Sequence, residues 1–299
     1  MTDRIDILKT YKMYIDGKFP RSESGRTMEV RRGDGKGLLA HACRGSRKDL
    51  RDAVEAARKA QLGWQNATPY LRGQILYRIA EMVEGKRDEL AALIDAARPA
   101  AKGGAKAAGG ALTGDREVTL SVDRLVHFAG WADKYSQVLG CNNPVSGPFY
   151  NFTIAEPTGV VAVVAPDEAP LLALVSLLAP AICSGNTAVA LASGLNPLPA
   201  LVLAEACATG DVPAGVVNIL SGERGELIKH IASHRDIDAV HAGNLSEADA
   251  TALRMGVAEN LKRVTLHRGI NWQDAAACEH PWWIEPMVEF KTVWHPSSV

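Results

Sequence analysis

Few aromatic residues occur in this sequence, and neither sign of charge is in excess. Phe, Trp and Tyr make up only 6% of the 299 residues, and 33 Lys and Arg residues are balanced by 34 Asp and Glu residues. Proteins that bind single strands of nucleic acid need aromatic side chains for stacking, and many nucleic-acid-binding domains carry a basic face. The composition therefore predicts a protein without a nucleic-acid partner.

Cysteine is scarce, and the cysteines that are present are scattered. None of the five forms a CxxC pair, and their number is odd. Such spacing predicts neither a disulfide framework nor a zinc site, so we expect no bound metal and a reducing, cytoplasmic location. The five residues are Cys43, Cys141, Cys183, Cys207 and Cys278.

Long apolar runs are also missing. The longest apolar stretch, residues 169–183, is interrupted by Pro170 and Pro180 and is too short to span a bilayer. The first twelve residues carry several charges and no apolar core, so they do not resemble a signal peptide. We expect a soluble protein with no membrane partner.

The second half of the sequence alternates between short apolar segments and helical segments. Residues 159–165 are apolar almost throughout, which is typical of a strand buried on both faces of a sheet. This alternation predicts an α/β fold with a doubly wound, Rossmann-like parallel sheet. The predicted strands are residues 159–165, 187–192, 216–220, 237–241 and 263–266, and the predicted helices are residues 170–183, 197–209, 224–233 and 246–259.

The first half of the sequence is predicted to be mainly helical. Ser46 and Asp49 form a capping-box pattern, Thr68 precedes a proline at a helix start, and apolar residues from Val118 onward recur at helical spacing. Residues 96–114, rich in Ala and Gly, are predicted to be either a frayed helix or a loose connection. Alternating residues predict two further strands, at residues 149–154 and 287–294.

Several short motifs, in order along the chain, resemble the aldehyde dehydrogenase superfamily. They include Ala129-Gly-Trp-Ala-Asp-Lys134, Glu156-Pro-Thr-Gly-Val-Val161, Val212-Pro-Ala-Gly-Val-Val-Asn218 and Leu261-Lys-Arg-Val-Thr-Leu266. The resemblance runs from about Met13 to about Gly269 and implies a truncated member that has the NAD-binding half. It implies four segments: an N-terminal helical part (1–145), a protruding oligomerisation hairpin (146–158), a Rossmann-like part (159–270) and a Trp-rich tail (271–299).

The residues that carry out the family's chemistry are altered here. The asparagine of the family's oxyanion hole aligns with Glu168, whose carboxylate would repel an oxyanion unless it were protonated. We interpret Asp167 and Glu168 instead as caps of the following helix. The general base of the family aligns with His267, and a histidine can act as a base near pH 7.

The family's nucleophilic cysteine has no counterpart in this sequence. In the family it lies well beyond the general base, in a catalytic domain that the sequence lacks. Cys278 is the only cysteine after His267, and it stands in no matching motif. We therefore assign no catalytic residue, and a chemical role for His267 or Cys278 stays open.

The family's cofactor-binding residues are partly replaced. The Lys and Glu that bind the adenosine ribose in the family align with Leu191 and Gly194. The sequence therefore predicts either no cofactor or weak binding of NAD(P). The resemblance places six remaining residues at the cofactor site: Pro166, Glu168, Ser193, Gly222, Gly243 and Asn244.

Three functions are compatible with these observations. We favour a catalytically inactive aldehyde dehydrogenase-like protein that acts as a structural or assembly subunit, in a homo-oligomer or together with a full-length aldehyde dehydrogenase. An NAD(P)-dependent aldehyde oxidoreductase that uses Cys278 with His267 is the alternative. A small-molecule or nucleotide sensor that kept the cleft without the chemistry is the third.

Overall fold

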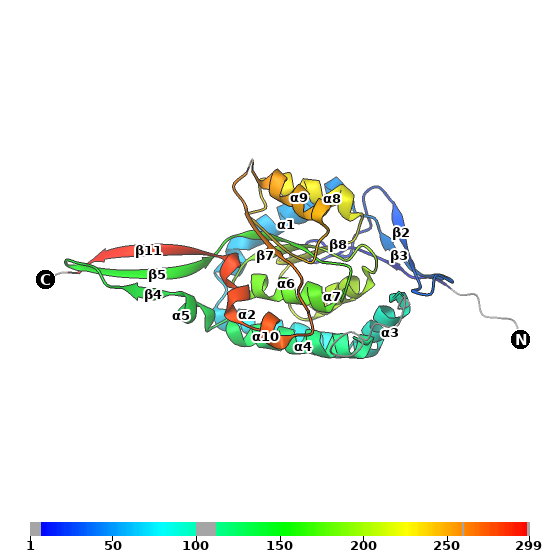
Figure 1. The fold of residues 1–299 in the computed structure, drawn as a ribbon, viewed down its shortest axis with the longest axis horizontal. Coiled ribbons are helices and arrows are strands. Elements are labelled where there is room, and N and C mark those ends of the chain that lie inside the picture. The colour runs from blue at the N-terminus through cyan, green and yellow to red at the C-terminus, as the bar shows by residue number, and fades with distance from the viewer. Residues whose placement is uncertain (1–6, 100–111, 259, 298–299) are drawn as a thin grey trace, which may run out of the picture.

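A parallel five-stranded sheet forms the centre of the protein (Figure 1). The computed structural model describes residues 7–99, 112–258 and 260–297. The strands lie in the order β10-β9-β6-β7-β8, so the chain winds outward from β6 in both directions. They are β6 (Val160–Val164), β7 (Thr187–Leu191), β8 (Val217–Leu220), β9 (Ala239–Gly243) and β10 (Arg263–His267).

Helices cover both faces of this sheet, which confirms the predicted doubly wound fold. Successive side chains of a strand point to opposite faces, and β6 follows this rule. Val161 and Val163 belong to one hydrophobic core, whereas Val160 and Val164 belong to the other. The helices that connect the strands are α6 (Leu172–Cys183), α7 (Leu198–Thr209), α8 (Arg224–Ser233) and α9 (Glu247–Val257).

The N-terminal helices complete the two layers. Helix α1 packs with α8 and α9 on one face, while α2 and α4 lie outside α6 and α7 on the other (Figure 1). The capping box of Ser46 and Asp49 and the cap at Thr68 are both present. These helices are α1 (Arg47–Gln65), α2 (Pro69–Glu84), α3 (Arg87–Ala97), α4 (Gly114–Trp131) and α5 (Tyr135–Leu139). Most of the predicted loose segment, residues 100–111, lies outside the described residues.

A small sheet precedes these helices. Its strands, in the order β1-β3-β2, are β1 (Thr10–Tyr11), β2 (Thr27–Arg31) and β3 (Leu38–Cys43). Between β1 and β2 the chain makes a tight turn in which Asp16 and Gly17 both have positive φ. Asp and Gly tolerate this conformation, and Ile15 and Lys18 exchange backbone hydrogen bonds across the turn.

A three-stranded antiparallel arm projects from one end of the protein (Figure 1). Its strands are β4 (Cys141–Asn143), β5 (Phe149–Pro157) and β11 (Val288–Pro296), and β5 lies in the middle. The predicted C-terminal strand is therefore present and pairs with β5 over its whole length. Because β11 is an outer strand, one of its edges has no strand partner among the described residues.

The segment between β10 and β11, here called the tail segment (residues 268–287), folds back onto the chain. It contains α10 (Ala275–Cys278) and two short 3-10 helices, η1 (Pro281–Trp283) and η2 (Glu285–Met287). Trp272 and Trp283 are buried in the same core as α4 and α6. Among the described residues, no helix is both long enough and apolar enough to cross a membrane.

Candidate functional site

The carboxyl ends of β6 and β9 define the crevice where a doubly wound sheet binds its ligand. These strands are neighbours, but the chain leaves them toward opposite ends of the sheet, which opens a gap between the loops that follow. Pro166, Asp167 and Glu168 follow β6, and Asn244 follows β9. Four of the predicted site residues, Pro166, Glu168, Gly243 and Asn244, thus belong to this switch point.

Asp167 is the centre of a polar cluster on one side of the crevice. Its Oδ1 accepts hydrogen bonds from Ser193 Oγ at 3.0 Å and from the Gly194 amide at 2.8 Å. Arg224 adds two charge-assisted bonds, at 2.7 Å and 3.0 Å. Burial alone would raise the pKa of Asp167, but these donors outweigh it and lower the pKa below its ordinary value.

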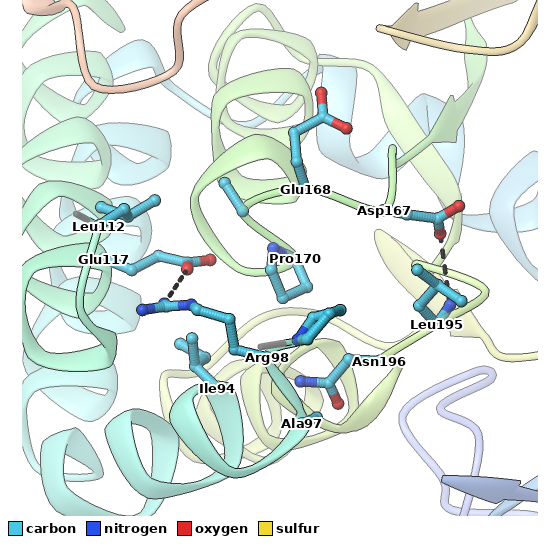
Figure 2. Close-up of a pocket in the computed structure, with 12 residues that line it drawn as sticks. Ile94, Ala97, Arg98, Leu112, Glu117, Asp167, Glu168, Pro170, Leu195 and Asn196 are labelled. Carbon is cyan, nitrogen blue, oxygen red and sulfur yellow. Dashed lines mark hydrogen bonds and ion pairs between the residues drawn. The ribbon is translucent and has the colours of Figure 1, made fainter. Parts of the chain in front are cut away.

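Glu168 points to the other side of the same loop (Figure 2). Its Oε1 accepts hydrogen bonds from Asn244 Nδ2 at 2.7 Å and from Trp272 Nε1 at 3.2 Å. Asn244 is itself fixed by two hydrogen bonds to the backbone of Ile270, at 2.9 Å and 3.0 Å. The carboxylate is therefore held between the end of β9 and the tail segment.

The interpretation of Asp167 and Glu168 as caps of α6 is wrong. The first amides of that region, Leu171 and Leu172, donate instead to Oε1 of Glu117, at 2.8 Å and 3.2 Å. Glu117 lies on α4, far away in sequence, so local spacing could not reveal it. With the helix start already satisfied, the two acidic residues after β6 bond to groups across the crevice.

Trp272 occupies the space beside Gly243. A Cβ on that glycine would lie 2.5 Å from Cη2 and 2.6 Å from Cζ2 of the indole ring. The indole is only 3% exposed. The position at which the resemblance places cofactor phosphates is therefore packed against the chain's own side chain.

His267, at the position of the family's general base, is paired with a second histidine. Its Nε2 lies 2.8 Å from Nε2 of His241, whose Nδ1 lies 3.0 Å from the carbonyl of Leu177. That carbonyl requires a proton on His241 Nδ1, so His267 donates its Nε2 proton to His241. Trp283 stacks on His267 with ring centroids 4.0 Å apart.

Both histidines are neutral near pH 7. Burial lowers the pKa of His241 to about 3 and that of His267 to about 4. A base with so low a pKa accepts protons weakly at neutral pH. The Nε2 atom of His267 is also occupied as a donor, so only Nδ1 is left to accept a proton.

No cysteine presents a reactive thiol to the crevice. Cys278 is completely buried, its sulfur lies 3.7 Å from the carbonyl oxygen of Asn271, and burial raises its pKa. Burial also raises the pKa of Cys183 and Cys207 to about 12. Cys141 is exposed, but it lies on β4 in the arm. A thiolate nucleophile requires a lowered pKa and access, which none of these residues combines.

The remaining predicted site residues lie in two different places. Ser193 joins the Asp167 cluster beside Gly194. Gly222 instead packs against the loop before α1, where an added Cβ would come within 3.2 Å of the Gly45 amide nitrogen. The structure therefore brings together Glu168, Gly243 and Asn244, places Ser193 nearby, and separates Gly222 from them.

The residues at this edge do not fit a dinucleotide in the way that the resemblance implies. Leu191 is buried and apolar, and the backbone amide of Gly194 already donates to Asp167. The polar groups of the crevice hydrogen-bond to one another, and Trp272 packs on Gly243. Among the described residues, no group of three or more His, Cys, Asp and Glu side chains is arranged to hold a metal ion.

The five-stranded parallel sheet and its switch point define a Rossmann-like α/β protein. The chain belongs to the aldehyde dehydrogenase family, because the model named "Aldehyde dehydrogenase family" matches residues 19–271. It is 33% identical over 263 residues to the mitochondrial aldehyde dehydrogenase of Sus scrofa, covering 86% of this chain and 48% of that protein. It is 31% identical over 265 residues to the mitochondrial benzaldehyde dehydrogenase of Antirrhinum majus, covering 86% and 47%.

Solved structures give the same result. The NAD+ complex of the aldehyde dehydrogenase from Bacillus cereus matches with a TM-score of 0.78 and 30% identity, over 87% of this chain and 51% of that chain. The chain thus spans about half the length of the relatives that it matches.

Proposed function

We propose that this chain is a non-catalytic aldehyde dehydrogenase-like subunit that joins another subunit of the family through its arm. Trp272 supports the first part most strongly. This residue belongs to the tail segment, yet it packs on Gly243 and donates to Glu168 in the crevice of the sheet. A ligand that approached the end of β9 would have to displace it. The crevice is thus closed by the protein itself.

The groups near this crevice give further support. His267 donates to His241 and lies beneath Trp283, and Cys278 is a buried thiol with a raised pKa. Without an accessible thiolate, this chain cannot form the covalent adduct that the family uses. We propose accordingly that its cysteines take no part in aldehyde oxidation and that it binds NAD(P) weakly or not at all.

The arm supports the second part of the proposal. Apolar side chains are exposed on both of its faces, and a small antiparallel sheet is marginally stable when neither face is covered. The free edge of β11 offers unpaired backbone groups to another strand. The exposed apolar residues are Phe149, Tyr150, Ile154, Phe290, Val293 and Trp294.

An aldehyde assay tests the catalytic part. Purified protein is incubated with short aliphatic and aromatic aldehydes and either NAD+ or NADP+, and reduced cofactor is followed by absorbance. We expect no turnover above the buffer blank. Turnover that co-purifies with the protein and disappears in Cys278→Ala would instead establish the rearranged oxidoreductase.

A calorimetric titration tests the cofactor part. We expect NAD+ to bind with a dissociation constant in the millimolar range or not at all, since two charge-assisted bonds to the ribose are missing. Low-micromolar affinity would contradict the proposal. Repeating the titration with Trp272→Ala shows whether the tail segment is what closes the crevice, because affinity would then increase in the variant.

Analytical ultracentrifugation tests the assembly part. We expect the native chain to sediment as a dimer or a larger oligomer, and the double variant Phe290→Asp/Trp294→Asp to sediment as a monomer with an unchanged circular dichroism spectrum. Trp282→Asp is the matched control, because Trp282 is 55% exposed but lies outside the arm. A native chain that stays monomeric, alone and when mixed with a longer relative, would exclude assembly through the arm.

A further inference from the structure

A second cavity lies beside the crevice, between the helices and the loops that follow β6 and β7. Its volume is about 460 Å³, which is within the range of small-molecule sites. The end of α3 and the beginning of α4 form one wall, and the segment from Asp167 to Pro170 forms another (Figure 2). Most of the lining is apolar and comes from Ile94, Ala97, Leu112, Ala169, Pro170 and Leu195.

Glu117 is the buried polar group of this cavity. Its side chain is 1% exposed, and its Oε1 accepts the two amides at the start of α6. Its other oxygen, Oε2, has no hydrogen-bond partner among the described residues. In Figure 2 the carboxyl group points from α4 into the space between Pro170 and Arg98.

Arg98 does not satisfy this oxygen. Its Nη2 lies 3.8 Å from Oε2, beyond hydrogen-bond distance, and its Nη1 is engaged by Asp95 at 3.1 Å. A buried carboxylate oxygen without a donor is costly, so such groups are nearly always paired in native proteins. The need for a donor in an otherwise apolar cavity indicates a ligand.

The charges around the cavity indicate the sign of that ligand. Glu117, Asp167 and Glu168 line it, while Arg98 is the only basic residue in the lining. Asp167 is neutralised by Arg224, so the lining keeps an excess of negative charge. A cation is therefore favoured over an anion, and an ammonium group is the donor that best matches a single carboxylate oxygen.

We propose that this cavity binds a small apolar primary amine, whose ammonium group donates to Oε2 of Glu117 and whose hydrocarbon part lies against Ile94, Leu112 and Leu195. The volume suits an amine with about six to eight carbon atoms. This site does not require the crevice to be open, because Gly243 and Trp272 are not part of its lining.

Calorimetry with three probes of matched size tests the proposal. n-Hexylamine, n-hexanol and n-hexanoate are titrated into the full chain at pH 7.5. We expect the amine to bind at least about tenfold more tightly than the alcohol and the carboxylate not to bind, because the charge-assisted bond is available to the amine alone. No binding of the amine, or tighter binding of the carboxylate, would overturn the proposal.

Three variants locate the site. Glu117→Gln keeps an oxygen for the α6 amides and should weaken amine binding by about tenfold or more, whereas Glu81→Gln, on an exposed part of α2, should not change it. Arg98→Ala should keep or increase the affinity, because it removes a cation near the proposed ammonium. Melting temperatures show that each variant is folded. Unchanged amine binding in Glu117→Gln would overturn the proposal.

If Glu117→Gln does not fold, Ala97→Phe takes its place. This substitution fills the cavity from the end of α3 and leaves Glu117 and its bonds to α6 intact. Amine binding should then be lost. Retained binding in this variant would overturn the proposal, and neither aldehyde turnover nor oligomeric state enters the measurement.

Discussion

Trp272 lies so close to Gly243 that the glycine has no room for a side chain. The nearest ring atom, Cη2, would stand 2.5 Å from an added Cβ. Gly243 ends β9, and Trp272 belongs to the tail segment, so this contact joins the central sheet to a part of the chain that follows it. The glycine is not in a left-handed conformation, so its small size alone matters here.

Gly243→Ala should destabilise the protein through this contact. We expect a loss of about 1–3 kcal/mol in the free energy of unfolding, which is typical of overpacking a buried site. In the Trp272→Ala background the same substitution should cost almost nothing, because the clashing ring is gone. Urea unfolding of the four proteins in this double-mutant cycle measures the coupling. Equal costs in both backgrounds would mean that the ring does not limit the position.

Trp272→Ala alone should lower the stability by about 3–5 kcal/mol, as for other buried tryptophans. Trp282→Ala is the matched control, because Trp282 is in the same tail segment but is 55% exposed. It should change the free energy of unfolding by less than about 0.5 kcal/mol. Similar losses in the two variants would show that the tail segment does not pack as described.

Arg124 should hold the tail segment in place. Its buried guanidinium donates to Glu279 at 3.1 Å and to the Trp272 carbonyl at 3.2 Å, and it also contacts Ser176 on α6. Arg124→Leu leaves these acceptors unpaired, at a cost of about 3–5 kcal/mol.

Hydrogen exchange measured by mass spectrometry checks this prediction. In Arg124→Leu the tail segment should exchange faster than the central strands, because its opening becomes separate from global unfolding. Arg116→Leu, at an exposed position on the same helix, is the control and should leave the exchange pattern unchanged. Uniformly faster exchange over the whole chain would contradict a local role.

The histidine pair should make stability depend on pH. The pKa values of His241 and His267 are about 3 and 4 in the folded protein, and an unfolded histidine has a pKa of about 6.5. Because the unfolded chain binds these protons more readily, stability is lost as pH falls below about 6.5. The pair should contribute a loss on the order of 2 kcal/mol between pH 7 and pH 5.

Urea unfolding at several pH values checks this expectation. The double variant His241→Gln/His267→Gln should show a shallower fall in the free energy of unfolding than the native protein. His295→Gln, on the exposed end of the arm, is the control and should follow the native curve. If the double variant also follows the native curve, the acid sensitivity belongs to other groups.

Thiol labelling should distinguish one cysteine from the other four. Cys141 is exposed, whereas Cys43, Cys183, Cys207 and Cys278 are buried. Ellman's reagent should therefore label one thiol in the native chain and five in guanidinium chloride. Cys141→Ser should remove the fast reaction. Rapid labelling of a second thiol would show that the tail segment or the core is open in solution.

The sheet could be predicted from the sequence because its signals are local. The apolar run of β6 and the helices that follow each strand have the lengths and periods typical of a parallel sheet. The error at β9 was small: the strand begins at Ala239, two residues later than predicted, and ends at Gly243. Element type depends on neighbouring residues, so single-sequence patterns determine it well.

The site was harder to predict because its contacts join distant parts of the chain. Glu168 was correctly placed at the crevice, but its partner Trp272 lies more than a hundred positions away. The cap of α6 comes from Glu117, and no local pattern indicates that a carboxylate on α4 reaches it. Arg224 and Trp272 were missed for the same reason. A charged or aromatic residue names its possible partners only by type.

The pairing of β5 with β11 has a consequence for the order in which the protein folds on the ribosome. Thr153 and Thr292 lie side by side with their hydroxyl oxygens 3.0 Å apart, although 139 positions separate them in the chain. The five strands of the central sheet are all synthesised before β11. During translation, β5 therefore waits with an open edge while the rest of the domain forms, and nascent-chain chaperones have a defined strand to protect until residue 296 has emerged.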